Sequence, residues 1–119
     1  MSHYAIIVVV ISGDLTHKKC VPCEGGVKPL TANEYGSYLR IALSGWSDVE
    51  EKSIVKEYKF KDFKEALGFV NKVGDIAESE GHHPDISLHN WNKVTVTLST
   101  HAIGGLSEND FIMASKIDA

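Results

Sequence analysis

Two adjacent histidines, His82 and His83, follow a predicted helix, and a third, His101, follows a predicted strand. Imidazole titrates close to neutral pH, so a histidine can donate or accept a proton without a metal or a cofactor. Glu78 lies four residues before His82, which is one helical turn, and we expect its carboxylate to orient the His82 ring. These residues therefore predict acid/base chemistry, provided that the fold brings the three imidazoles into one pocket.

Each histidine also has a plainer interpretation. A histidine at the C-terminal end of a helix is stabilised by the helix dipole whatever its function. Histidine is also the commonest zinc ligand, and His89 adds a fourth candidate. Adjacent histidines seldom bind one ion, however, and the chain has neither an HExxH motif nor a second cysteine pair beside Cys20 and Cys23. We therefore expect neither a metal nor another cofactor, with a zinc enzyme as the weaker alternative.

Cys20 and Cys23 form a CxxC motif, which can be half of a zinc site, a redox pair or a turn, and His17 could supply a third ligand. Prolines and glycines follow between residues 22 and 29, whereas a redox pair needs the start of a helix. We interpret the motif as an ordered loop. Its cysteines are expected to stay reduced because we expect the protein in the cytoplasm.

Three helices are predicted to position these residues. The first begins with a capping box at Thr31 and Glu34 and ends at Gly45. The second begins at Asp62 and ends at Gly81. Its apolar stripe should face the core and comprises Phe63, Ala66, Leu67, Val70, Val73, Gly74 and Ala77.

A short third helix begins at Ser107, and we expect Asp110 to cap it rather than to take part in chemistry. Strands are predicted in two hairpins. The first joins Trp46–Glu50 to Ser53–Phe60, and the second lies within residues 85–100 with its turn near Asn90. The order is α-β-β-α-β-β-α, which predicts an α+β two-layer sandwich, a four-stranded antiparallel sheet with helices packed on one face.

Length and charge exclude several classes of function. The chain has 119 residues, enough for one domain, and a net charge of −4. No basic stripe is present, so we expect no direct contact with nucleic acid. The apolar run Ala5–Ile11 has seven residues, whereas a membrane-spanning helix needs about 20, so we expect a strand there and no membrane partner.

Seven residues in the second half of the chain follow a distinctive spacing: Glu78, His82, His83, Pro84, Trp91, His101 and Asp110. This spacing resembles the signature of the pterin-4a-carbinolamine dehydratase family. The stretches "CVPCEGG", "ALSGW", "FKDF" and "NKVTVTLSTHAIGGLSENDF" resemble the same family, so the resemblance covers about residues 20–118. It implies a single domain over residues 20–119, preceded by an N-terminal extension over residues 1–19.

The resemblance implies dehydration of a 4a-hydroxytetrahydropterin to the quinonoid dihydropterin and water, in tetrahydrobiopterin recycling. His82 and His101 would transfer protons, and His83 would bind and polarise the pterin. The remaining pocket residues implied are Glu78, Gly81, Pro84, Ser99, Thr100 and Ala102. Some members of the family carry an acidic residue where this chain has Gly81, so the carboxylate that supports His82 should come from Glu78 or Asp85.

The resemblance also implies a homodimer or homotetramer, formed through the sheet edge and the helices. The extra apolar residues Phe69 and Ile76 on the second helix agree with such an interface. Animal relatives also act as dimerisation cofactors for a transcription factor. A binding module built on the same fold is therefore the alternative to the enzyme.

Overall fold

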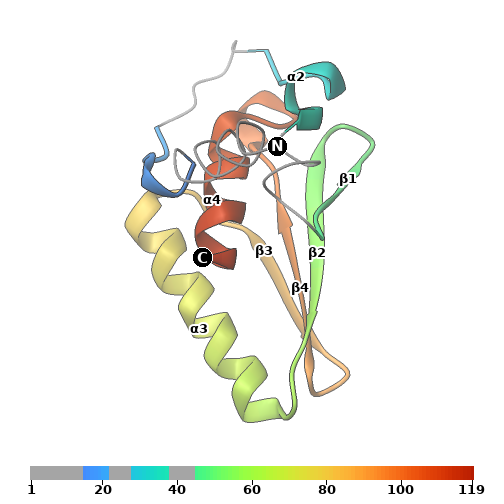
Figure 1. Cartoon of the computed structure of the whole chain (residues 1–119), viewed down its shortest axis with the longest axis vertical. Coiled ribbons are helices and arrows are strands. Elements are labelled where there is room, and N and C mark those ends of the chain that lie inside the picture. The colour runs from blue at the N-terminus through green and yellow to red at the C-terminus, as the bar shows by residue number, and fades with distance from the viewer. Residues whose placement is uncertain (1–14, 22–27, 38–44) are drawn as a thin grey trace, which may run out of the picture.

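The computed structural model describes residues 15–21, 28–37 and 45–119, and Figure 1 shows their arrangement. Within this part of the chain, four strands form one antiparallel sheet in the order β1-β2-β4-β3. The helices α3 and α4 lie together on one face of the sheet (Figure 1), so the predicted α+β fold is confirmed. The elements are α2 (Ala32–Ser37), β1 (Ser47–Val49), β2 (Ser53–Lys59), α3 (Phe63–Glu80), β3 (Asp85–His89), β4 (Lys93–Leu98), the short 3-10 helix η2 (His101–Ile103) and α4 (Glu108–Asp118).

Both hairpins form close to their predicted positions, although β1 and β2 are slightly shorter than predicted. In β4 the side chains of Val94, Val96 and Leu98 are buried and the intervening ones are only partly covered, as the alternation predicts. The predicted first helix is described from Ala32 to Ser37, and its remainder lies outside the described residues. Cys23 and the apolar run 5–11 lie outside them as well.

The helix α3 begins and ends where its capping residues predict. The Asp62 side chain accepts a hydrogen bond from the Glu65 N–H. At the other end Gly81 adopts a left-handed conformation with φ of 68°, and its N–H donates to the Ala77 carbonyl. The chain therefore leaves the helix axis abruptly at Gly81, immediately before the two histidines.

The predicted apolar stripe of α3 is only partly correct. Ala66, Val73 and Ala77 are buried, but the side chains of Phe63 and Leu67 are 51% and 44% exposed. The reason is tertiary, because α4 covers only the C-terminal part of α3 and leaves its first turns beyond the end of α4 (Figure 1). Phe69 and Ile76, the extra apolar residues on this helix, are half-buried and pack against the core.

The core lies between the sheet and α4, which is buried on almost every side. Ser107 and Asp110 form the predicted capping box at the start of α4. At its end Asp118 accepts hydrogen bonds from Trp46, Lys56 and Tyr58. Because α4 is held at both ends, its first turn has a fixed position beneath the chain segments that carry the histidines. Its buried apolar residues are Phe111, Ile112, Met113, Ala114 and Ile117.

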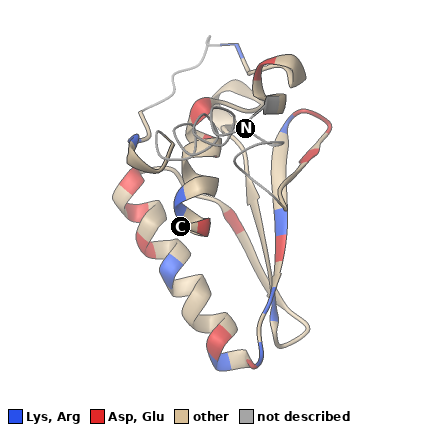
Figure 2. Cartoon of the chain, in the orientation of Figure 1, with Lys and Arg blue, Asp and Glu red and all other residues tan. Residues whose placement is uncertain are grey.

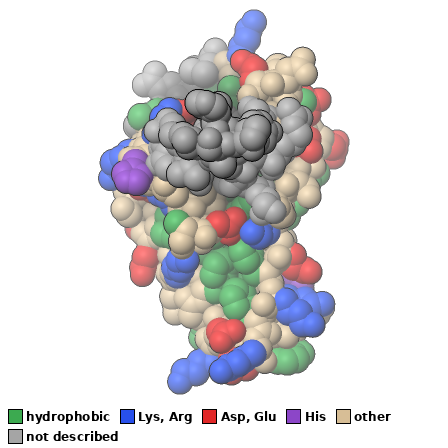
Figure 3. Space-filling model, viewed as in Figure 1, with side chains coloured by type: hydrophobic (Ala, Val, Ile, Leu, Met, Phe, Trp, Pro, Cys, Tyr) green, Lys and Arg blue, Asp and Glu red, His purple; other side chains and the backbone are tan. Residues whose placement is uncertain are grey.

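The surface charge is uneven. Acidic residues predominate on the C-terminal half of α3, where Asp75, Glu78 and Glu80 lie (Figure 2). A patch of hydrophobic side chains is visible between α3 and the sheet, bordered by charged side chains (Figure 3). No helix in the described part of the chain is long and apolar enough to span a membrane.

Candidate active site

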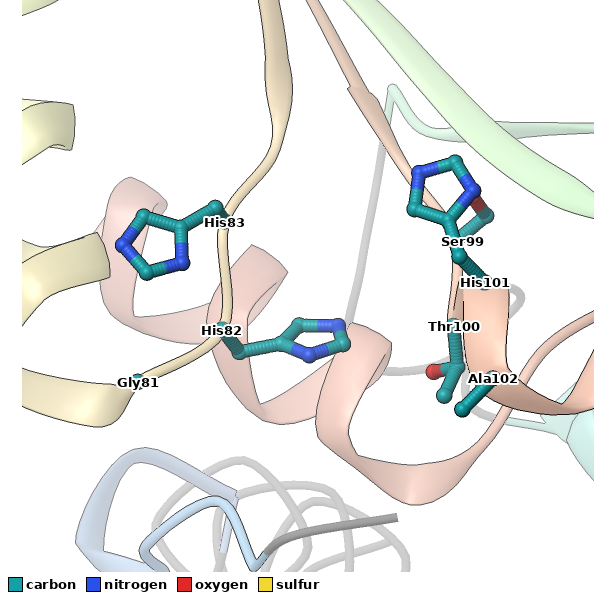
Figure 4. Close-up of a pocket in the computed structure, with 7 residues that line it drawn as sticks. All are labelled: Gly81, His82, His83, Ser99, Thr100, His101 and Ala102. Carbon is teal, nitrogen blue, oxygen red and sulfur yellow. The ribbon is translucent and has the colours of Figure 1, made fainter. Parts of the chain in front are cut away.

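A cavity of about 370 Å³ lies where the end of α3 meets the end of β4. His82 and His83 lie on one side of it and His101 on the other (Figure 4). The three predicted histidines therefore share one cavity, although they come from two separate segments of the chain. The cavity is lined by Gly81, His82, His83, Ser99, Thr100, His101 and Ala102.

Two of the predicted substrate-binding residues, Glu78 and Pro84, are not among the residues that line the cavity. Pro84 starts the path into β3, and Glu78 is exposed on the last turns of α3. Asp85, considered as an alternative carboxylate near His82, is also exposed, and its backbone pairs with Thr97 in the sheet.

The partner of His82 differs from the predicted one. His82 Nε2 lies 2.7 Å from Asp110 Oδ1, whereas Glu78 lies 2.6 Å from His83 Nε2. The i,i+4 spacing that links Glu78 to His82 holds only within a helix, and the left-handed Gly81 ends the helix before His82. The His82 ring consequently turns toward α4, and the next residue, His83, returns to the Glu78 side.

Asp110 is both the predicted helix cap and the carboxylate that contacts His82. Its side chain is completely buried. One oxygen, Oδ2, accepts hydrogen bonds from the Ser107 N–H at 3.0 Å and from the Thr100 hydroxyl at 2.8 Å. The other oxygen, Oδ1, is therefore left for His82. Helix capping alone accounts for an aspartate at position 110, so nothing in the sequence indicated its second contact, with His82.

This contact determines the tautomer of the His82 ring. A carboxylate oxygen can only accept a hydrogen bond, so Nε2 carries a proton and Nδ1 is the nitrogen available to a ligand. The arrangement therefore presents Nδ1 of His82 for proton transfer with a ligand in the cavity.

The other two histidines are less enclosed. The His83 side chain is 60% exposed, and its partner Glu78 is 79% exposed, so this contact contributes little to stability. The His101 ring has no hydrogen-bond partner among the residues that the structure describes. The His101 ring is therefore available to a ligand in the cavity.

The position of His101 depends on a short backbone frame. The Thr100 N–H donates to the Gly105 carbonyl at 2.8 Å, and Thr100 and Ser107 share a hydroxyl–hydroxyl hydrogen bond of 2.7 Å. Gly104 closes η2 in a left-handed conformation with φ of 68°. The frame thus connects the segment that carries His101 to the first turn of α4, which carries Asp110.

The remaining metal and redox candidates lie elsewhere. His89 is on β3, where its ring contacts Thr95 at 2.8 Å and Glu57 at 3.6 Å. Cys20 is a free thiol, and burial together with the negative charge of Glu80 raises its pKa to about 12. In the described residues no three His, Cys, Asp or Glu side chains lie together in a way that could hold a metal ion.

Comparison with known proteins identifies the family of this chain. The model of the pterin 4 alpha carbinolamine dehydratase family matches residues 28–119. A candidate pterin-4-alpha-carbinolamine dehydratase of Alkaliphilus metalliredigens is 47% identical over 105 residues, which cover 88% of this chain and 94% of the relative. Its counterpart in Nitrosospira multiformis is 50% identical over 105 residues, which cover 88% of this chain and 90% of the relative.

Solved structures agree with this assignment. The crystal structure of a transcriptional coactivator/pterin dehydratase from Brucella melitensis is 40% identical, with a TM-score of 0.70, and the match covers 76% of this chain and 96% of that one. A pterin dehydratase-like RuBisCO assembly factor of the alpha-carboxysome is 19% identical, with a TM-score of 0.53. The match covers 63% of this chain and 87% of that one, and it shows a similar fold alone. The chain therefore belongs to the pterin 4 alpha carbinolamine dehydratase family, a family of hydro-lyases, as its sequence predicts.

Proposed function

We propose that this protein dehydrates a 4a-hydroxytetrahydropterin to the quinonoid dihydropterin by histidine acid/base catalysis, in the recycling of a tetrahydropterin. The observation that carries the proposal is the shared cavity of His82, His83 and His101, with His82 backed by the buried carboxylate of Asp110. Family membership supports the choice of substrate. The cavity volume of about 370 Å³ lies within the usual range for small-molecule sites.

The reaction needs one proton delivered and one removed. The C4a–O bond breaks as the hydroxyl group takes a proton and leaves as water. The N5–H proton departs, and the N5 electron pair forms the C4a=N5 double bond. No net oxidation occurs, and the two proton transfers balance, so two imidazoles in opposite protonation states are sufficient.

The surroundings of the three histidines suggest which one is the acid and which one is the base. The contact of His82 Nε2 with Asp110 leaves Nδ1 available to the ligand, so we assign His82 as the acid that protonates the leaving hydroxyl through Nδ1. His101, whose ring has no partner among the described residues, is then the base that accepts the N5 proton. His83 lies at the exposed edge of the cavity, where it contacts the pterin and is oriented by Glu78.

The proposal is tested by following the ultraviolet absorbance of freshly generated 4a-hydroxytetrahydropterin in the presence of a chelator. The wild type should accelerate dehydration, and His82→Ala and His101→Ala should each lose about 10²–10⁴-fold in kcat. Both variants should keep the unfolding transition of the wild type. Absence of wild-type acceleration would refute the proposal, and loss of wild-type turnover on chelation would replace it with a metal-dependent mechanism.

A second candidate function is a binding module for a transcription factor. It is favoured by the Brucella melitensis structure, whose name includes a transcriptional coactivator. A variant with His82, His83 and His101 all replaced by alanine separates the two functions. A module would keep its partner and its assembly state after losing any dehydratase activity.

We also propose that the protein forms a homodimer or homotetramer. Phe63 and Leu67 expose apolar surface on the first turns of α3, in the part of the helix that α4 does not cover. Large apolar side chains grouped on a surface are typical of protein interfaces. Cytoplasmic residence remains a prediction, consistent with the free thiol of Cys20.

A further inference from the structure

A second cavity of about 280 Å³ adjoins the candidate active site. It shares the segment Ser99, Thr100 and His101 with the first cavity, so the two cavities meet at this segment. Its remaining lining residues are Lys52, Gly104 and Gly105. A ligand held beside His101 in the first cavity can therefore extend a substituent past His101 into the second.

Two glycines, Gly104 and Gly105, line part of the second cavity. A Cβ atom added to Gly104 would meet no atom within 4 Å, so the space above this residue is open. A Cβ atom added to Gly105 would lie 2.7 Å from the Pro29 side chain, so Gly105 is packed tightly from behind. The Thr100 and Gly105 backbones pair, which holds the two glycines beside Thr100. The cavity therefore has open space at Gly104 and close packing at Gly105.

Lys52 supplies the one permanent charge among the described residues that line this cavity. It lies on the turn between β1 and β2, where its N–H donates to the Val49 carbonyl. Its ammonium group forms no ion pair with any carboxylate in the described part of the chain. Two acidic neighbours, Glu50 and Glu51, share the turn, and Glu51 directs its carboxylate to the Ala32 N–H at 3.2 Å.

The position of the variable substituent on the pterin ring connects the two cavities. A pterin carries its variable substituent on C6, which is bonded directly to N5. If His101 accepts the N5 proton, the substituent must leave the ring on the His101 side, where the second cavity opens. The ammonium group of Lys52, which has no ion-pair partner among the described residues, would attract a negatively charged substituent there more strongly than an apolar one.

We propose that the second cavity holds the C6 substituent of the pterin and that Lys52 makes the site prefer an anionic substituent, a carboxylate or a phosphate. The inference rests on the proposed function, because it places the pterin ring in the first cavity. It assigns Lys52 to substrate selection, and the family match says nothing about which substituent this chain prefers.

The test compares three pterins by isothermal titration calorimetry: 6-hydroxymethylpterin, its phosphate monoester and pterin-6-carboxylate. The wild type should bind the anionic ligands about two- to fivefold more tightly than the neutral one, the range expected of a solvent-exposed ion pair. Lys52→Gln should abolish this preference without weakening the neutral ligand, and added salt should reduce it in the wild type. Comparing the two anionic ligands shows which anion fits.

Lys64→Gln is the matched control, because it removes the same charge from an exposed residue in the first turn of α3. That turn lies about 25 Å along the helix from Gly81. The control should retain the preference. An equal preference in Lys52→Gln and the wild type, or no preference in the wild type, would overturn the inference. Dehydration catalysed by His82 and His101 would remain in either case, whereas failure of all three pterins to bind would overturn both proposals.

Discussion

Replacing Asp110 by asparagine removes one charge from the candidate active site while leaving the shape of the side chain almost unchanged. In the wild type, Oδ2 accepts two hydrogen bonds, from Ser107 and Thr100, and Oδ1 contacts His82. The single carbonyl oxygen of an asparagine must stay on the Oδ2 side to satisfy these two donors. The amide NH2 group then faces His82 Nε2.

This forced orientation reverses the hydrogen bond to His82. The amide nitrogen can only donate, so Nε2 must become an acceptor and the proton of the neutral ring must move to Nδ1. The imidazolium form, with a proton on both nitrogens, would place two N–H groups against each other. His82 could no longer act as a cationic acid, and we expect kcat to fall about 10²–10⁴-fold. In hydrolases that use a carboxylate–histidine pair, the same change costs about 10⁴-fold.

The fold should survive this change. The Ser107 and Thr100 bonds remain but become neutral, and a hydrogen bond to a charged group contributes about 1 kcal/mol more than a neutral one. We therefore expect Asp110→Asn to lower the free energy of unfolding by about 1–3 kcal/mol, which denaturant titration measures. The nitrogen chemical shifts of His82 report its tautomer directly.

The matched control is Asp62→Asn, because Asp62 is also the N-cap of a helix and lies at the far end of α3 from the cavity. It should keep kcat near the wild-type value. The reasoning would be refuted if Asp110→Asn retained kcat within about threefold of the wild type in a folded protein, since proton transfer by a positioned group contributes far more. An equal fall of kcat in Asp62→Asn would refute the reasoning as well.

Three further outcomes follow from the described contacts. Burial alone would raise the pKa of Glu80, but its hydrogen bond to Lys116 lowers that pKa below the ordinary value. The pair therefore stabilises the fold above the unfolded-state pKa of Glu80, and this contribution is lost as the pH falls through the folded-state pKa. Glu80→Gln should therefore destabilise the protein by about 1–3 kcal/mol in urea at pH 7 and by much less near pH 3, whereas equal losses at both would contradict this. Cys20, whose pKa is raised to about 12, should resist iodoacetamide at pH 7.5 until the protein is unfolded, as mass spectrometry of its peptide would show. Replacing both Phe63 and Leu67 by lysine should lower the mass of the assembly in analytical ultracentrifugation, and an unchanged mass would exclude this face as an interface.

The order of helices and strands was predictable from the sequence because its signals are local. The caps of α3 and α4 depend on residues three positions apart, and the alternation in β4 depends on nearest neighbours. The spacing of the histidines carried the family resemblance for the same reason. The order of these elements is confirmed by the structure, and the family is confirmed by the comparisons.

The partners within the site were not predictable in this way. His82 and Asp110 are 28 residues apart, and only the packing of α4 against the end of α3 brings them together. The helical spacing pointed to Glu78 instead, because nothing local showed that the turn at Gly81 would exchange the partners of His82 and His83. Exposure of Phe63 and Leu67 depends likewise on how far α4 extends along α3.

By itself the sequence determined which residue types were available for proton transfer, where each helix and strand begins, and to which family the chain belongs. Only the tertiary structure decided which carboxylate supports which histidine, which residues line the cavity, and that Lys52 borders a second cavity beside it. Element boundaries reflect interactions within a few residues of the chain, whereas hydrogen-bond partners and cavities depend on the relative placement of elements that are distant in sequence.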